Sequence, residues 1–178
     1  MTRVHTGSSG GPTSAGSSMS TSPTHASSHQ ASWLGRGLTG PSTLGIGDPA
    51  LVGPPELPVW TRVTGSSDDP AVNQALLAYA TDGFLIATAM RPHEGVGQAL
   101  AHRSISTSVL SHTLTFHEPV DAGAWHLLAH ESPYAGRGRA FGRAQVFTQD
   151  GQLVASYGQE SLLRANPRWD PSQEPGRH

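Results

Sequence analysis

The chain has 178 residues and a formal net charge of −2, so its length allows one ordinary domain with tails. This charge gives no electrostatic reason to expect binding to nucleic acid or to an anionic membrane surface. Cysteine and lysine are both absent, which excludes thiolate catalysis, cysteine-based zinc sites, disulfide bonds and Schiff-base chemistry.

Residues 1–50 form a low-complexity segment rich in Ser, Gly, Thr and Pro. Its few apolar residues cannot offset the entropy of ordering, so we predict that it is disordered. An expression tag or the remnant of a longer protein's front half would look the same. No apolar run approaches the ~20 residues of a membrane span. We expect a soluble, cytoplasmic protein with one domain at residues 51–165 and an irregular tail at 166–178.

The domain begins with a strand and a helix. Alternating apolar residues predict the strand at 57–63. The helix is predicted from Asp69, a good N-cap, with Pro70 in the first helical position, to about Met90. Its apolar positions recur at helical spacing, at Val72, Ala75, Leu76, Tyr79 and Phe84. Residues 91–95 then end it.

Four strands are predicted after the helix, at 106–116, 125–131, 139–148 and 152–164. The first alternates strictly and places His112 among apolar residues. Asp150-Gly151 supplies the positive φ angles that a tight antiparallel hairpin needs. One long helix followed by an antiparallel meander predicts an α+β domain in which a curved sheet wraps the helix, the hotdog fold.

Asp82 is the most informative polar residue of the predicted helix. Tyr79 and Ala75 lie three and seven residues before it, so its carboxylate shares an apolar stripe. A carboxylate on such a face must be paired, hydrogen-bonded or protonated. One interpretation is a catalytic base in a partly dry site. The other is that it accepts bonds from a nearby loop, or that the helix ends earlier and exposes it.

Other polar residues carry weaker signals. Gln159 and Glu160 are adjacent in the last strand, so only one can face the helix. A glutamine there is either a surface residue or a group that positions water. His112 alone is more typical of a core histidine than of a ligand, and the arginines Arg137 and Arg139 of a Gly-Arg-Gly-Arg run suit either solvent or a phosphate. Metal-binding and serine-hydrolase motifs are absent, so we predict no metal and no acyl-serine.

Four separated segments resemble, in order and spacing, the second half of type II acyl-CoA thioesterases. They are LAYATD at 77–82, SHTLTFHEP at 111–119, DGQLVAS at 150–156 and QE at 159–160. The resemblance implies hydrolysis of fatty acyl-CoA to free fatty acid and CoA, without a cofactor or covalent intermediate. It also implies that Asp82, Gln159 and a hydroxyl residue activate the attacking water. Separately from the resemblance, we predict His112, Arg137 and Arg139 as candidate contacts of the acyl-CoA.

The hydroxyl residue departs from the family pattern. Val109 stands where the family commonly has Thr or Ser, and Ser111 where it commonly has Asp. Either Ser108 or Ser111 substitutes, or the site works with two members. Strand alternation favours Ser111, because it lies on the face of Val109, whereas Ser108 would need a bulge.

The family carries two hotdog units in one chain, whereas this sequence resembles only the second. A lone unit exposes surface that normally packs against its partner, so we expect a homodimer or higher oligomer. An alternative function is a non-catalytic acyl-CoA-binding or truncated interaction domain. A third is an enoyl-CoA hydratase, for which only His93 and Glu94 are local candidates. The fold alone does not choose among them.

Overall fold

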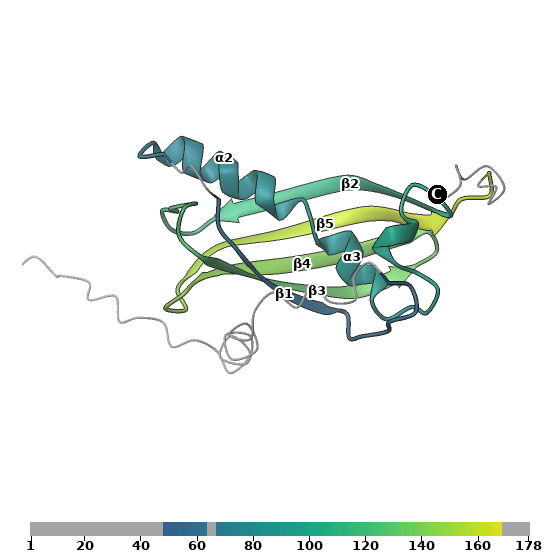
Figure 1. Ribbon diagram of the computed structural model, residues 1–178. Coiled ribbons are helices and arrows are strands. Elements are labelled where there is room, and N and C mark those ends of the chain that lie inside the picture. Colours follow the sequence, from purple (N-terminus) through teal and green to yellow (C-terminus); the bar gives the residue numbers. More distant parts are fainter. Residues whose placement is uncertain (1–47, 64–66, 169–178) are drawn as a thin grey trace, which may run out of the picture.

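The structure is a computed structural model that describes residues 48–63 and 67–168. Predictions for residues 1–47 and most of the tail lie outside this part of the chain. The elements in order are β1 Glu56–Thr61, α2 Pro70–Thr81, α3 Leu85–Met90, a short 3-10 helix Gln98–Leu100, β2 Ile105–Phe116, β3 His126–Gly136, β4 Arg139–Thr148 and β5 Leu153–Ala165 (Figure 1). Neither α-helix of the described residues is long and apolar enough to cross a membrane.

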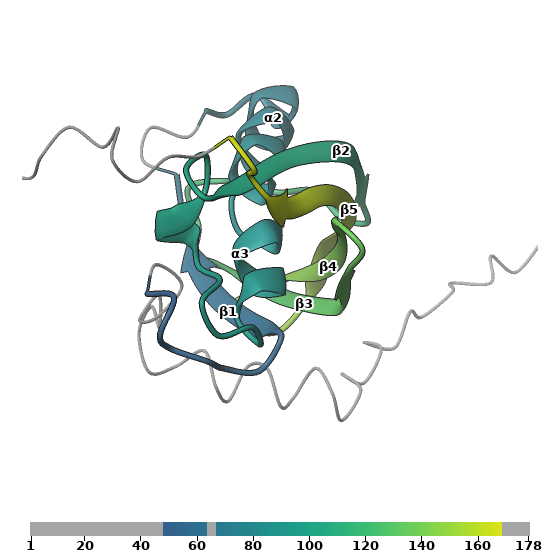
Figure 2. The same cartoon turned by 90° about the vertical axis from the view of Figure 1, so that its right-hand side faces the viewer.

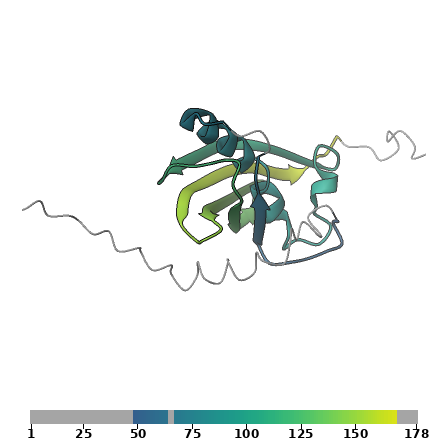
Figure 3. The same ribbon diagram turned by 60° about the vertical axis from the view of Figure 1, so that its left-hand side comes forward.

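The five strands form one antiparallel sheet in the order β1-β3-β4-β5-β2. Figure 2 shows the sheet curling around α3, while α2 lies above β2 (Figure 3). This arrangement confirms the predicted α+β hotdog fold. The long strand β2 forms one edge of the sheet, which leaves one side of it without a neighbouring strand.

The prediction of a single long helix from Asp69 to about Met90 is wrong. The N-cap is confirmed, since the Asp69 carboxylate accepts a hydrogen bond from the Ala71 N–H at 2.8 Å. However, α2 ends at Thr81, and α3 begins only at Leu85. Asp and Gly at 82–83 are both weak helix formers, and apolar spacing that runs across them does not reveal the break.

The prediction of which residues form the buried face of this helix is also wrong. The buried residues of α2 are Asn73, Leu77 and Thr81, at a spacing of four. Tyr79, placed on the stripe, is 87% exposed. The buried face holds polar residues because Asn73 binds the surrounding loops, donating to the Ser67 carbonyl at 2.6 Å and accepting from the Ala122 N–H at 3.1 Å. Hydropathy spacing cannot detect such a face.

The strands follow the prediction closely. The hairpin between β4 and β5 is confirmed, but of the predicted Asp150-Gly151 pair only Gly151, at φ 88°, has a positive φ angle. The second predicted strand is too short, because β3 continues to Gly136 after an irregular register near Ser132. Arg137 and Gly138, with φ of 52° and 75°, therefore form a two-residue hairpin turn.

The core lies between α3 and the inner face of the sheet. Its largest cluster contains Leu77, Leu85, Val120, Leu128, Ala144, Val146, Val154, Ala155 and Tyr157. Gly142 on β4 lets α3 approach closely, because a Cβ built there would lie 2.8 Å from Leu85 Cδ2. Gly142 pairs with Gln159 on β5, so the close approach of Leu85 occurs at the sheet position next to that glutamine.

Gly142→Ala is expected to destabilise the fold by about 1–3 kcal/mol, because the buried Leu85 side chain has to move. Gly158→Ala on neighbouring β5 is the matched control, since its Cβ would meet Phe141 at an ordinary 3.7 Å. Urea unfolding of both variants measures the difference. Equal midpoints for the two variants would show that the close approach of α3 does not need the glycine.

Candidate active site

The end of α2 places a buried hydroxyl beside the sheet. Thr81 is fully buried, and its hydroxyl donates to the Ala78 carbonyl at 2.7 Å. A regular helix would satisfy that carbonyl with the N–H of residue 82, but the Asp82 N–H turns to the Tyr79 carbonyl instead. The Thr81 hydroxyl thus replaces a backbone donor that is lost where the helix ends.

A chain of side-chain hydrogen bonds starts from this hydroxyl. Thr81 Oγ1 lies 3.0 Å from His112 Nε2, and His112 Nδ1 lies 3.0 Å from Gln159 Oε1. The Gln159 amino group donates to Ser161 Oγ at 3.0 Å. We call Thr81, His112, Gln159 and Ser161 the polar chain. It joins the end of α2 to β2 and β5.

The polar chain is buried at both ends and open at His112. Thr81 is 0% exposed and Ser161 2%, and Gln159 is also buried, whereas His112 is exposed even though both of its ring nitrogens are bonded. The neighbouring Glu160 is exposed on the other face of the sheet. Gln159, and not Glu160, is therefore the residue that faces the helices.

A β-bulge in β2 decides which residues share the face of Gln159. Val109 pairs with Ser161 and His112 with Gln159, but Ser111 pairs with the outward Glu160. The expectation that Ser111 lies on the face of Val109 is therefore wrong, because the extra residue Leu110 shifts the alternation.

The structure brings neither candidate serine to Gln159. Ser108 pairs with Leu162, next to the inward Ser161, and its hydroxyl donates to the Val109 carbonyl at 3.3 Å. Ser111 lies on the outer face with Glu160. Thr81 is the hydroxyl that the structure does bring to the site. Its position four residues after Leu77 and eight after Asn73 is the sequence signal that identifies it.

Asp82 is exposed, so the expectation that its carboxylate lies on a buried stripe is wrong, and the alternative, that the helix ends earlier and exposes it, is confirmed. It caps the C-terminus of α2 and follows Thr81 directly. Its position is therefore one residue from the polar chain, at the point where the helix gives way to the turn before α3. A carboxylate there reaches solvent and is available to a molecule that binds over the end of α2.

A second buried polar pair lies deeper in the core. His130 is fully buried, with Nδ1 bonded to the Leu57 carbonyl at 2.7 Å and Nε2 to the Tyr157 hydroxyl at 2.6 Å. Burial lowers the pKa of His130 to about 4 and raises that of Tyr157. Both groups are therefore neutral at pH 7, and they join β1, β3 and β5.

With this geometry established, comparison with known proteins identifies the family. Residues 16–163 match the family model described as the acyl-CoA thioesterase C-terminal domain. The chain belongs to this family. The match covers most of the chain and includes Asp82, His112 and Gln159.

Relatives whose names are known support this family assignment. The chain is 38% identical over 112 residues to acyl-CoA thioesterase 2 of Haemophilus influenzae, covering 62% of this chain and 38% of that protein. It is 31% identical over 121 residues to human acyl-coenzyme A thioesterase 8, covering 67% of this chain and 36% of that protein. The solved acyl-CoA thioesterase II of Mycobacterium marinum matches with TM-score 0.55 and 34% identity, over 64% of this chain and 43% of that one. The chain thus spans less than two fifths of the length of these curated relatives.

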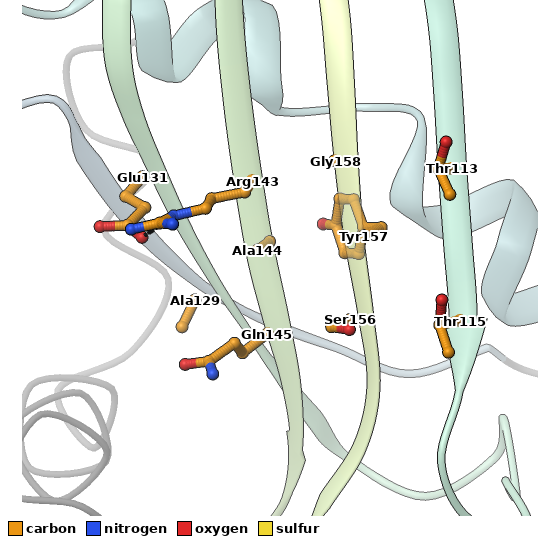
Figure 4. Close-up of a pocket in the computed structure, with 10 residues that line it drawn as sticks. All are labelled: Thr113, Thr115, Ala129, Glu131, Arg143, Ala144, Gln145, Ser156, Tyr157 and Gly158. Atoms are coloured by element: carbon orange, nitrogen blue, oxygen red, sulfur yellow. Dashed lines mark hydrogen bonds and ion pairs between the residues drawn. The ribbon is translucent and has the colours of Figure 1, made fainter.

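Two pockets of this family member do not include Gln159 in their lining. One, of about 450 Å³, opens on the face of the sheet opposite the helices, and Figure 4 shows Arg143 and Glu131 paired at one side of it. The other, of about 570 Å³, lies at the end of the sheet around the β3–β4 turn. It is lined by Arg137, His93 and Arg164, but not by Arg139. Of the two arginines that the sequence grouped together, only Arg137 therefore lines this pocket, and Arg139 lies just after the turn.

Proposed function

We propose that the chain hydrolyses fatty acyl-CoA to free fatty acid and CoA. The observation that carries the proposal is the polar chain, which links the buried carboxamide of Gln159 through His112 to Thr81, the residue before the exposed Asp82. Membership of the acyl-CoA thioesterase family supports the substrate class.

In this proposal Asp82 is the general base and Gln159 holds the attacking water. The water loses a proton to Asp82 while its oxygen bonds to the thioester carbonyl carbon. The carbon–sulfur bond then breaks, the acid product keeps the oxygen of water, and CoA leaves with the proton as a free thiol. No cofactor and no covalent acyl intermediate are needed.

The proposed site works with two members rather than three. Val109 occupies the face of Gln159 where a hydroxyl is expected, and neither Ser108 nor Ser111 reaches that face. The Thr81 hydroxyl already donates its proton to the Ala78 carbonyl, so Thr81 supports the site by its hydrogen bond to His112.

We further propose that Arg137 meets the phosphates of CoA. It shares the pocket at the end of the sheet with Arg164 and His93, and guanidinium groups bind phosphate through paired hydrogen bonds. Arg139 is exposed just after the turn, where it adds positive charge near the same pocket. His112 contacts substrate in this proposal through the open face of its ring.

The proposed active form is a homodimer or higher oligomer. β2 is a long edge strand with exposed Val109 and Leu110, and α2 exposes Val72 and Tyr79 nearby. A second copy that covers this surface would also enclose Asp82. Light scattering at assay concentration tests this, and a monomeric mass would contradict it.

Thiol release from straight-chain acyl-CoAs of increasing length tests the function. We expect release with at least one chain length, at a rate proportional to protein concentration. The second candidate, a non-catalytic acyl-CoA-binding domain, is favoured by Val109 at the hydroxyl position. Saturable acyl-CoA binding without thiol release would select that candidate and contradict hydrolysis.

A further inference from the structure

The polar chain permits few arrangements of its hydrogens. Thr81 has one hydroxyl proton, and the Ala78 carbonyl at 2.7 Å takes it. The Thr81 oxygen therefore accepts from His112, so His112 Nε2 carries a proton. Nε2 therefore carries a proton whether the imidazole is neutral or positively charged.

Whether the other ring nitrogen, Nδ1, donates or accepts depends on the charge of His112. When His112 is doubly protonated, Nδ1–H donates to the Gln159 carbonyl oxygen, and the Gln159 amino group donates to Ser161. When His112 is neutral, Nδ1 is an acceptor, so Gln159 has to present its amino group to it. The Gln159 carbonyl then accepts from the Ser161 hydroxyl. Both arrangements match a donor with an acceptor at each link of the chain, but with the carboxamide turned end for end.

We propose that His112 is a positioning residue whose protonation sets the direction of the Gln159 carboxamide. Thr81 is the fixed acceptor at one end, and the Ser161 hydroxyl at the other end changes between acceptor and donor. The exposed ring allows His112 to exchange protons with water, while Gln159 itself stays buried. The inference rests on the proposed function, in which Gln159 holds the attacking water.

Reversal of the carboxamide changes what Gln159 offers to a ligand. Only one of its two N–H groups is used within the polar chain. The spare N–H lies at the His112 side in the neutral state and at the Ser161 side in the charged state. The donor available to a water or a thioester carbonyl therefore moves across the site when His112 gains a proton.

Few other titratable groups face His112. From β5, the Tyr157 ring lies 5.5 Å from the His112 ring, and its hydroxyl is held by His130, which is neutral near pH 7. From α2, Asp82 follows Thr81 and is exposed. Glu160 lies on the opposite face of the sheet, and on β2 itself the neighbour on the same face is Leu114.

Side-chain ¹⁵N NMR of the substrate-free chain tests the switch directly. We expect neutral His112 to be the Nε2–H tautomer, and the Gln159 NH₂ signals to shift with the same midpoint as the His112 ring. Loss of signals in His112→Gln assigns the ring. An Nδ1–H tautomer, or Gln159 signals that do not follow His112, would overturn the proposal.

Thr81→Val removes the acceptor for Nε2–H with little change in shape, and Thr81→Ser restores it. We expect Thr81→Val to lower kcat between about threefold and tenfold, the effect of one hydrogen bond, at unchanged KM. It should also change the pH profile, whereas Thr81→Ser recovers the wild-type profile. A wild-type kcat and profile in Thr81→Val would overturn the proposal. A chain with no hydrolysis would refute the proposed function instead, while the NMR result still decides the switch.

Discussion

Asp82→Asn is expected to lower kcat/KM for acyl-CoA hydrolysis by at least about 100-fold, the usual contribution of a general base. Asparagine keeps the shape of the side chain and its hydrogen-bonding oxygen, but it cannot take a proton from water. Because Asp82 is exposed at the end of α2, the fold should tolerate the change. Thiol release gives kcat/KM, and calorimetry shows whether acyl-CoA still binds.

Asp68→Asn is the matched control for this variant. Asp68 is an exposed carboxylate before the opposite end of α2, outside the proposed site, and its change should leave kcat/KM within about twofold, as surface substitutions usually do. If Asp82→Asn kept the rate of the control variant, Asp82 would not be the base.

Acidification from pH 6.5 to pH 4 is expected to remove about 3 kcal/mol of stability through His130 alone. Burial lowers the pKa of His130 to about 4 in the fold, against 6.5 in the unfolded chain. Between these values the unfolded chain binds the extra proton, so the free energy of unfolding falls as pH falls. Burial also lowers the pKa of His126, which adds to the loss in the same direction.

Urea unfolding at several pH values and one protein concentration measures this loss. His130→Leu should flatten the slope between pH 6.5 and 4, even though it leaves the Tyr157 hydroxyl and the Leu57 carbonyl without their partner. The exposed His93 provides the control, because His93→Gln should retain the wild-type slope. A wild-type slope in His130→Leu would show that other groups cause the acid sensitivity.

Local signals in the sequence are sufficient for most of the fold. Asp69 and Pro70 mark the start of α2, and Asp150-Gly151 marks the β4–β5 hairpin, because capping and turn geometry depend on neighbouring residues only. The break after Thr81 is different. Its stability depends on tertiary bonds made by Asn73 and Thr81, which hydropathy spacing does not contain.

The site is less predictable than the fold for the same reason. Family motifs single out Asp82 and Gln159, and the structure holds Gln159 in place through His112. The bulge at Leu110 turns Ser111 away from that face, and strict alternation cannot foresee an unpaired residue. The bonding of His130 to Tyr157 likewise joins strands that are far apart in the sequence.

The number of CoA thiols released per chain is the most direct test of the proposed function. The wild-type chain, at a concentration where its mass in solution is known, is mixed with excess acyl-CoA of the preferred length. Hydrolysis by activated water predicts steady release of many equivalents, together with matching free fatty acid. Saturable binding with no thiol released, at any chain length, would contradict the hydrolytic role of Asp82 and Gln159.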